Sequence, residues 1–187
     1  MTAFRIFLGG PSQSGKTTTA ARLARKMDFV HICLDKDPAL RTVMHGPPIE
    51  NKHAHLRRRV FEIVDHARRD SIIEGSQVTP EEITAHLDGD PTALCVFCGY
   101  PRANLVEKLR SLRDADFPNA AHLRRRTHLE RLARLQKYRD TGRRVEKMCE
   151  ELGLIFGDFS DLDRRDADQE VFMTRIAEQV ARQRAQG

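Results

Sequence analysis

Residues 10–17 constrain the fold of this chain more than any other segment. They read Gly-Pro-Ser-Gln-Ser-Gly-Lys-Thr and fit the pattern G-x-x-x-x-G-K-[ST] in full. Glycine at both ends lets the backbone curl so that successive N–H groups face inward onto phosphate oxygens. Lys16 is then expected to reach the β- and γ-phosphates, and the Thr17 hydroxyl can ligate Mg²⁺. The positive end of the helix expected after this loop adds to the attraction.

We therefore predict that one continuous segment holds the phosphates of a nucleoside triphosphate. Its members are Gly10, Pro11, Ser12, Gln13, Ser14, Gly15, Lys16, Thr17 and Thr18. An apolar segment precedes this loop and an amphipathic pattern follows it, which is the strand–loop–helix context that the mechanism requires.

Short apolar segments alternate with longer helical patterns along the rest of the chain. The expected strands are residues 3–8, 29–34, 71–73, 93–98 and 154–156. Their continuous apolar character suits a parallel sheet that is covered on both faces. Apolar stripes with helical spacing, such as Val60, Ile63, Val64 and Ala67, separate them. We predict one doubly wound α/β domain over residues 1–187.

Composition limits the choice of partners. No apolar run approaches the roughly 20 residues that span a bilayer, and the N-terminus lacks the pattern of a secretion signal. We therefore expect a cytoplasmic protein with no membrane contact. A net charge of +5, with ten Lys/Arg against three acids in residues 121–147, favours anionic ligands. The lack of Trp and of interleaved aromatic and basic residues disfavours nucleic acid.

Four cysteines raise the question of a metal or redox site. Cys95 and Cys98 have CxxC spacing but lie in an expected strand, where residues three apart point to opposite faces. A zinc or thioredoxin-type pair needs a turn or helix start instead. We interpret the four residues as buried free thiols of a reducing compartment.

Charged residues follow the second and third expected strands. In a doubly wound sheet the carboxyl ends of the strands form the ligand crevice, which places Asp35, Asp37 and Glu74 near the phosphate loop. Asp35 could accept a substrate proton or hold Mg²⁺ through water, and Arg41 could bind an anionic group of the substrate. Glu74 could stand near Mg²⁺ or the attacking group.

Each of these residues also has a structural interpretation. Asp37 could cap a helix whose first position is Pro38, and both roles can hold at once. Glu74 could be a strand-end residue that faces solvent. The arginine-rich stretch could be a solvated helix face, although arginines on a mobile segment can close over a transferring phosphoryl group. Among them we select Arg126 and Arg131 as candidate catalytic residues.

Together these residues resemble the P-loop small-molecule and nucleotide kinases, which include adenylate, shikimate, gluconate and 2-phosphoglycerate kinases. Residues 8–17 are similar to their opening strand and loop, and residues 35–37 resemble the D-x-D of shikimate kinases. Residues 37–41 resemble the D-x-x-x-R of nucleotide kinases. Residues 72–75 resemble the pattern of 2-phosphoglycerate kinases, and residues 149–158 look like the fifth strand of this fold.

The resemblance implies a five-stranded parallel sheet in the order 2-3-1-4-5. It also implies a substrate-binding insertion at about residues 38–70 and a helical lid at about residues 118–142. Where nucleotide kinases carry an arginine after the third strand, this chain has Ser76-Gln77, and no lid R-x-x-x-R can be matched uniquely.

The expected activity is ATP- and Mg²⁺-dependent phosphoryl transfer to a hydroxyl or phosphate group of a small molecule. Lys16 would hold the phosphates, Thr17 and Glu74 the metal, and Asp35 would be the general base. Asp37, Arg41 and Glu74 are the expected substrate-binding residues. A nucleoside monophosphate kinase and a regulatory nucleotide-binding protein or NTPase switch remain the alternatives.

Overall fold

The computed structural model describes residues 3–114 and 126–186. Its sheet contains five parallel strands in the order β2-β3-β1-β4-β5, which confirms the expected topology. The strands are β1 (Arg5–Gly9), β2 (Val30–Cys33), β3 (Ser71–Gly75), β4 (Ala93–Gly99) and β5 (Ile155–Asp158). Each strand lies within two residues of the expected bounds at both ends.

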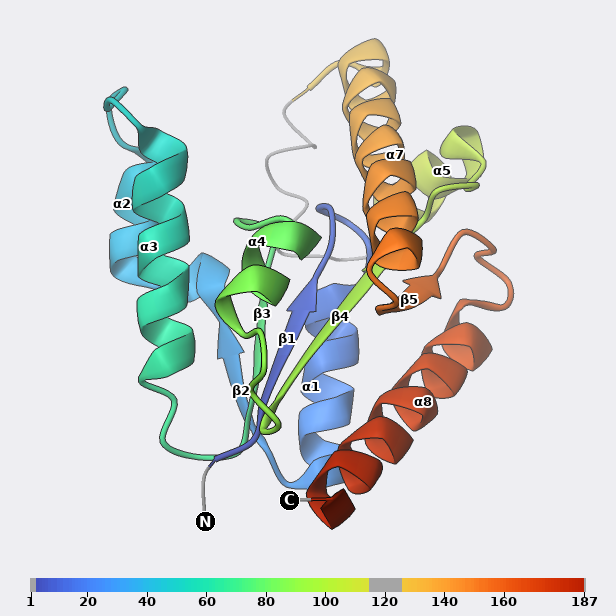
Figure 1. Cartoon of the computed structure of the whole chain (residues 1–187). Coiled ribbons are helices and arrows are strands. Elements are labelled where there is room, and N and C mark those ends of the chain that lie inside the picture. Colours follow the sequence, from blue (N-terminus) through green and yellow to red (C-terminus); the bar gives the residue numbers. More distant parts are fainter. Residues whose placement is uncertain (1–2, 115–125, 187) are drawn as a thin grey trace.

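Helices cover both faces of this sheet (Figure 1). They are α1 (Lys16–Met27), α2 (Pro38–His45), α3 (Lys52–Asp65), α4 (Pro80–His86), α5 (Leu105–Asp114), α7 (His128–Glu151) and α8 (Arg165–Gln186). A short 3-10 helix, η1 (Leu34–Lys36), joins β2 to α2. No described helix combines the length and the apolarity needed to cross a membrane.

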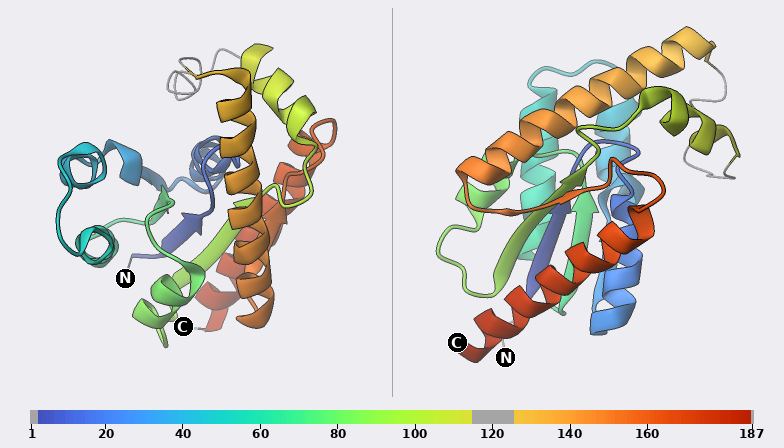
Figure 2. Two further views of the ribbon diagram at one scale, coloured as in Figure 1. Left: turned by 90° about the horizontal axis from the view of Figure 1, so that it is seen from above. Right: turned by 90° about the vertical axis from the view of Figure 1, so that its right-hand side faces the viewer.

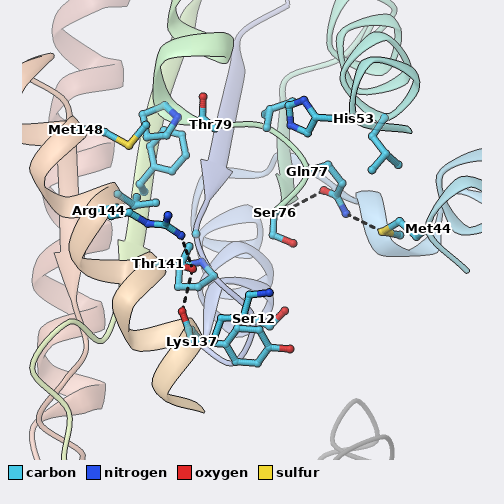
Figure 3. Close-up of a pocket in the computed structure, with 18 residues that line it drawn as sticks. Ser12, Met44, His53, Ser76, Gln77, Thr79, Lys137, Thr141, Arg144 and Met148 are labelled. Atoms are coloured by element: carbon cyan, nitrogen blue, oxygen red, sulfur yellow. Dashed lines mark hydrogen bonds between the residues drawn. The ribbon is translucent and has the colours of Figure 1, made fainter. Parts of the chain in front are cut away.

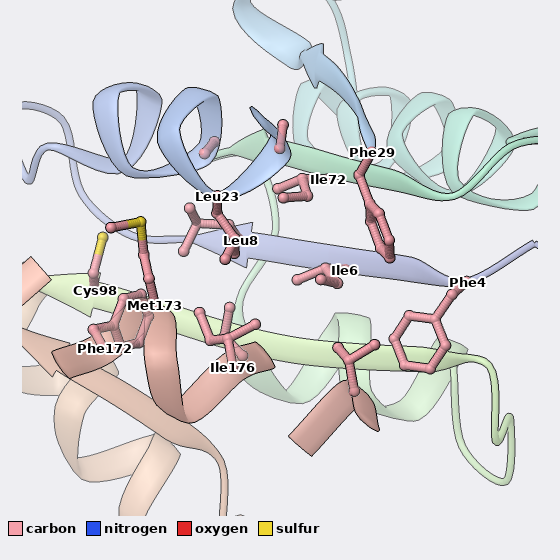
Figure 4. Packing of buried hydrophobic residues seen from close by; sticks show 14 of the residues in the cluster. Phe4, Ile6, Leu8, Leu23, Phe29, Ile72, Cys98, Phe172, Met173 and Ile176 are labelled. Carbon is pink, nitrogen blue, oxygen red and sulfur yellow. The ribbon is translucent and has the colours of Figure 1, made fainter. Parts of the chain in front are cut away.

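Alternate residues of the strands supply two separate cores. Ile6 and Leu8 of β1 pack with Leu23 of α1 and Ile176 of α8 on one face (Figure 4). Phe7 of β1 faces the opposite way, into a core that α3, α4 and α7 complete. Figure 2 shows α7 and α8 from two further directions. The continuous apolar strands thus reflect burial on both faces.

Three of the four cysteines lie in these two cores, whereas Cys33 is only half-buried, so the expectation that all four are buried is wrong for Cys33. Cys98 lies in the core beneath α1 and α8, whereas Cys95 and Cys149 lie in the other core. All four cysteines are free thiols, and burial raises the pKa of Cys98 to about 11 and of Cys95 to about 12. The expectation that Cys95 and Cys98 point to opposite faces is confirmed.

Candidate active site

The phosphate loop connects β1 to α1, and its backbone demands glycine at two positions. Gly10 has a φ of 143°, and a Cβ there would lie 2.1 Å from the carbonyl oxygen of Cys98. Gly15 has a φ of 91° and immediately precedes α1. Lys16 is 5% exposed, and its Nζ donates to the carbonyl oxygen of Pro11 at 3.5 Å. The lysine therefore spans the loop in the position needed to meet phosphate oxygens.

Two side chains behind the loop hold it against β4. The Tyr100 hydroxyl donates to the carbonyl oxygen of Ser12 at 3.2 Å, and Ser14 Oγ lies 3.5 Å from Cys98 Sγ. Tyr100 is fully buried, and burial raises the pKa of its hydroxyl. Sequence reasoning did not single out Tyr100, because no local pattern marks a contact between segments 88 residues apart.

Glu74 ends up beside Thr17, as the order of the strands predicts. The Thr17 hydroxyl donates to Glu74 Oε1 at 3.0 Å. Glu74 is completely buried, and its Oε2 has no hydrogen-bond partner among the described residues. The interpretation of Glu74 as a strand-end residue facing solvent is therefore wrong: the side chain points into the protein beside the loop.

This pair of oxygen ligands fits Mg²⁺. A buried carboxylate oxygen without a partner is costly unless a cation or donor meets it, and hydroxyl and carboxylate oxygens are the ligands that Mg²⁺ takes. His31 Nε2 lies 3.9 Å from Glu74 Oε1, and burial lowers the pKa of His31, which favours the neutral ring. A neutral His31 supplies no positive charge to balance the Glu74 carboxylate.

Asp35 is held by a residue to which the sequence assigned no role. Gln77 follows β3, and its Nε2 donates to Asp35 Oδ1 at 2.7 Å. Gln77 Oε1 in turn accepts from the backbone N–H of Ser76 at 2.8 Å, which fixes the amide. Ser76-Gln77 is the pair that stands where nucleotide kinases carry an arginine. In this chain, Gln77 of that pair orients the Asp35 carboxylate.

Asp37 has the capping role that was its structural interpretation. Its Oδ1 accepts from the backbone N–H of Leu40 at 2.9 Å at the start of α2, and Pro38 occupies the first helical position. Arg59 Nη2 donates to Asp37 Oδ2 at 2.9 Å and lowers the pKa of that carboxyl. Arg41 lies exposed on α2.

The two candidate catalytic arginines lie at the start of α7. Arg131 Nε donates to the carbonyl oxygen of Arg126 at 2.9 Å. Neither residue is among those that line the pocket described below. The expected lid begins at residue 118, and its first part, up to residue 125, lies outside the described residues. A catalytic role for Arg126 and Arg131 stays a prediction.

A pocket of about 540 Å³ opens beside the phosphate loop (Figure 3). Gly10, Pro11 and Ser12 of the loop form one end of it, and Ser76 and Gln77 lie along one wall. Its other walls come from α2, α3, the segment leading into α4, and α7. A pocket of this size suits a small metabolite.

Two further cations lie behind the loop. Arg165, at the start of α8, places Nη2 2.8 Å from where a Cβ on Gly15 would be, and burial lowers the pKa of its guanidinium. Lys108 is 1% exposed, and its Nζ lies 4.6 Å from the centroid of the Tyr100 ring. Burial and the nearby Arg165 lower the pKa of Lys108 to about 7. Arg165 therefore places positive charge beside the loop, whereas Lys108, with a pKa of about 7, carries only part of a charge near neutral pH.

The arrangement of sheet, loop and pocket can be compared with solved structures. A gluconokinase from Sinorhizobium meliloti 1021 superposes with a TM-score of 0.58 at 16% identity, over 97% of both chains. A shikimate kinase from Bacteroides thetaiotaomicron gives 0.58 at 18% identity, over 94% of this chain and 96% of that one. A shikimate kinase from Acinetobacter baumannii, in complex with shikimate, gives 0.58 at 16% identity over 95% of both.

The chain has a P-loop kinase fold. The likeness is structural, since no protein-family profile matches the sequence. No curated protein matches it in sequence either. At such low identity the neighbours define the fold, and the chemistry of the site has to be argued from the residues of this chain.

Proposed function

We propose that this chain is an ATP- and Mg²⁺-dependent kinase that phosphorylates a hydroxyl or phosphate group of a small molecule in the cytoplasm. One observation carries the proposal: the phosphate loop and Gln77, whose amide holds Asp35, line a single pocket. Asp35 itself is not among the described residues that line it. Gly10, Ser12 and Gln77 all line it. A hydrolase or switch needs only the loop and a water, whereas a pocket of about 540 Å³ beside the loop leaves room for an acceptor.

The residues divide the work of transfer between them. Lys16 and the loop amides hold and orient the phosphates, and the acceptor oxygen attacks the γ-phosphorus in line with the departing β-phosphate oxygen. Asp35, oriented by Gln77, takes the proton of an acceptor hydroxyl. Mg²⁺, held by Thr17 and Glu74, would offset the charge that develops on the phosphate oxygens.

The helical pair α2 and α3 and the arginines of the expected lid complete the proposal. Residues 38–70 form the helical pair α2 and α3, which contributes a wall of the pocket and suits a substrate-binding insertion. Arg41, Asp37 and a lid arginine, Arg126 or Arg131, are proposed to contact the acceptor or the transferring group when residues 118–142 close. The free thiols suit the reducing conditions of the cytoplasm.

The proposal is tested by ATP turnover with and without a panel of small acceptors. The panel contains hydroxy acids, polyols, phosphorylated metabolites and nucleoside monophosphates. ADP formation that depends on one acceptor class, with the matching phosphorylated product detected by mass spectrometry, supports the kinase. Hydrolysis that no acceptor stimulates would assign the chain to the NTPases, and stimulation by nucleoside monophosphates alone would assign it to the nucleotide kinases.

A further inference from the structure

The walls of the acceptor pocket are largely apolar. Methionine, aliphatic and aromatic side chains from five separate segments face it (Figure 3). They are Met44, Leu56, Val78, Phe97, Val145 and Met148. A hydroxyl pressed against one of these apolar side chains loses its hydrogen bonds to water and gains none, which weakens binding. Polar side chains, among them Ser76, Thr79 and Tyr138, line the rest of the pocket. The walls favour a ligand body made mostly of carbon.

Among the described residues that line the pocket, the lysine and arginine side chains all belong to one stripe. Lys137, Thr141 and Arg144 are spaced to share a face of α7, and all three line the pocket. Arg144 Nη2 donates to Thr141 Oγ1 at 3.4 Å, and Thr141 Oγ1 donates to the carbonyl oxygen of Lys137 at 2.9 Å (Figure 3). Thr141 therefore helps to hold the guanidinium along the pocket wall.

These cations lack a carboxylate partner within the part of the chain that the structure describes. No ion pair involves Lys137 or Arg144 there, and no Asp or Glu is among the described residues that line the pocket. The neighbouring Arg143 differs: its Nε donates to the carbonyl oxygen of Pro101 at 2.9 Å, and its Nη1 lies 3.4 Å from Asp140 Oδ1. The stripe thus offers unneutralised charge to a ligand.

We infer that the acceptor is a hydroxylated compound with an apolar body and a single anionic group. The anionic group lies against Lys137 and Arg144, the body packs on the methionines and Phe97, and the hydroxyl points toward the phosphate loop and the Asp35–Gln77 pair. This inference rests on the proposed kinase activity and narrows its substrate class. Sugar acids that carry a hydroxyl on every carbon fit the charge but not the walls.

Matched probes separate charge from apolar character. We would titrate para-hydroxymethylbenzoate, its uncharged amide, a phosphonate analogue and gluconate into the whole chain by calorimetry, with Mg·ADP present. The benzoate or the phosphonate is expected to bind at least about 10-fold more tightly than the amide, because only the charged group meets the α7 cations. The same anion is also expected to bind more tightly than gluconate by a similar factor. The better of the two anions identifies the preferred group.

Paired variants assign the effect to the stripe. Arg144→Gln is expected to remove most of the preference for the acid over the amide, whereas Arg143→Gln, one residue away and outside the pocket, is expected to keep it. Thermal melts show whether both variants fold as the parent does. Met148→Gln is expected to weaken binding of the benzoate and to reduce the difference in affinity between the benzoate and gluconate.

The inference is overturned if gluconate binds as tightly as the benzoate, if acid and amide bind alike, or if no probe binds. ATP binding is measured on the same samples, so the proposed function is judged separately. A chain that binds ATP and phosphorylates polyols would keep its kinase activity and lose this substrate class. A chain that binds the benzoate but no ATP would keep this ligand preference and lose the proposed kinase activity.

Discussion

Thr17 and Glu74 meet at the mouth of the phosphate loop, the first from the start of α1 and the second from β3. One carboxylate oxygen accepts from the threonine, and the other is buried with no partner in the described residues. A buried acid in this condition destabilises the fold on its own. We therefore expect a cation to bind beside the Glu74 carboxylate and to offset this cost.

Glu74→Gln tests this interpretation, because it keeps the shape of the side chain and removes the charge. The metal-free variant is expected to gain about 1 kcal/mol in free energy of unfolding, as the uncompensated buried charge is gone. The Mg²⁺ concentration for half-maximal activity is expected to rise about 10-fold or more. Denaturant titration and a Mg²⁺ titration of turnover give the two values. A metal-free variant less stable than the parent would mean that Glu74 serves packing.

Lys16→Ala is expected to lower kcat/KM for ATP by a factor of about 100 to 1,000, because an ammonium directed at the β- and γ-phosphates is lost. Lys26→Ala is a suitable control. Lys26 lies in the last turn of the same helix, where it pairs with Glu170 at 3.6 Å. Steady-state kinetics on both variants should separate them clearly. Equal losses would indicate a general effect of removing positive charge.

The sequence identifies those site residues whose roles follow from a local sequence pattern. Gly10, Gly15 and Lys16 belong to one continuous pattern, so their roles follow from spacing. Gln77 and Tyr100 do not, because their contacts join segments that are distant along the chain. Arg165 lies beside Gly15 only because α8 returns to α1, and no local signal marks that contact.

Helix α2 illustrates how one side chain serves an entire element. Asp37 accepts from a free N–H at the start of the helix and pairs with Arg59 of α3, so it joins the two helices that form one side of the pocket. The pKa of Asp37 is lowered in the folded chain. Its contribution to stability is therefore present at pH values above its unfolded pKa of about 3.9 and is lost as the pH falls through the lower folded pKa.

Asp37→Ala is expected to lower the free energy of unfolding at pH 7 by about 1–2 kcal/mol, since the cap and the ion pair both disappear. Asp37→Asn keeps a capping oxygen and should cost less. Urea titrations at pH 7 and at pH 3 measure both. The difference between parent and Asp37→Ala should shrink at the lower pH, and a difference that grows would contradict the assignment.

Tyr100 ties β4 to the phosphate loop through a single hydroxyl. Tyr100→Phe is expected to cost about 1 kcal/mol of stability and to raise the KM for ATP several-fold, because the carbonyl of Ser12 loses its donor. Thermal melts and ATP kinetics give both values. A stability loss with unchanged KM would limit the hydroxyl to packing.

Elements are predicted from sequence more completely than the site. The five strands appear within two residues of their expected bounds, because an apolar run between two helical patterns has few alternatives. The structure adds Glu74 and Gly75 to β3 and Gly99 to β4, because these residues pair in the ladder although they are not apolar. All three residues are buried, but a pattern of apolar side chains does not mark them in the sequence.

Across the whole molecule, the carboxyl ends of the parallel strands lie along one edge of the sheet (Figure 1). The phosphate loop, Glu74 and the pocket beside the loop lie at this edge. Ligands that bind there are in contact with segments from both halves of the chain. Binding should therefore stabilise the molecule as a unit rather than one helix.

Mg·ATP at 100 times its dissociation constant is expected to raise the free energy of unfolding by about 2.7 kcal/mol. For a chain of this length that corresponds to a rise in Tm of roughly 5–10 °C. Differential scanning calorimetry measures it, with Lys16→Ala as the variant that should show little rise at the same concentration. A parent chain whose Tm does not respond to Mg·ATP would contradict the nucleotide site.

Under the proposed function, the position of the stripe of Lys137, Thr141 and Arg144 has a consequence for how substrate preference could change. The stripe lies more than a hundred residues after the loop that handles the phosphates, on a helix that contributes nothing to that loop's backbone. If the stripe binds the acceptor as proposed, substitutions there are expected to change the preferred acceptor and to leave the phosphate loop intact. Libraries that randomise this helical face alone would sample new substrates from a background that still folds and still binds nucleotide.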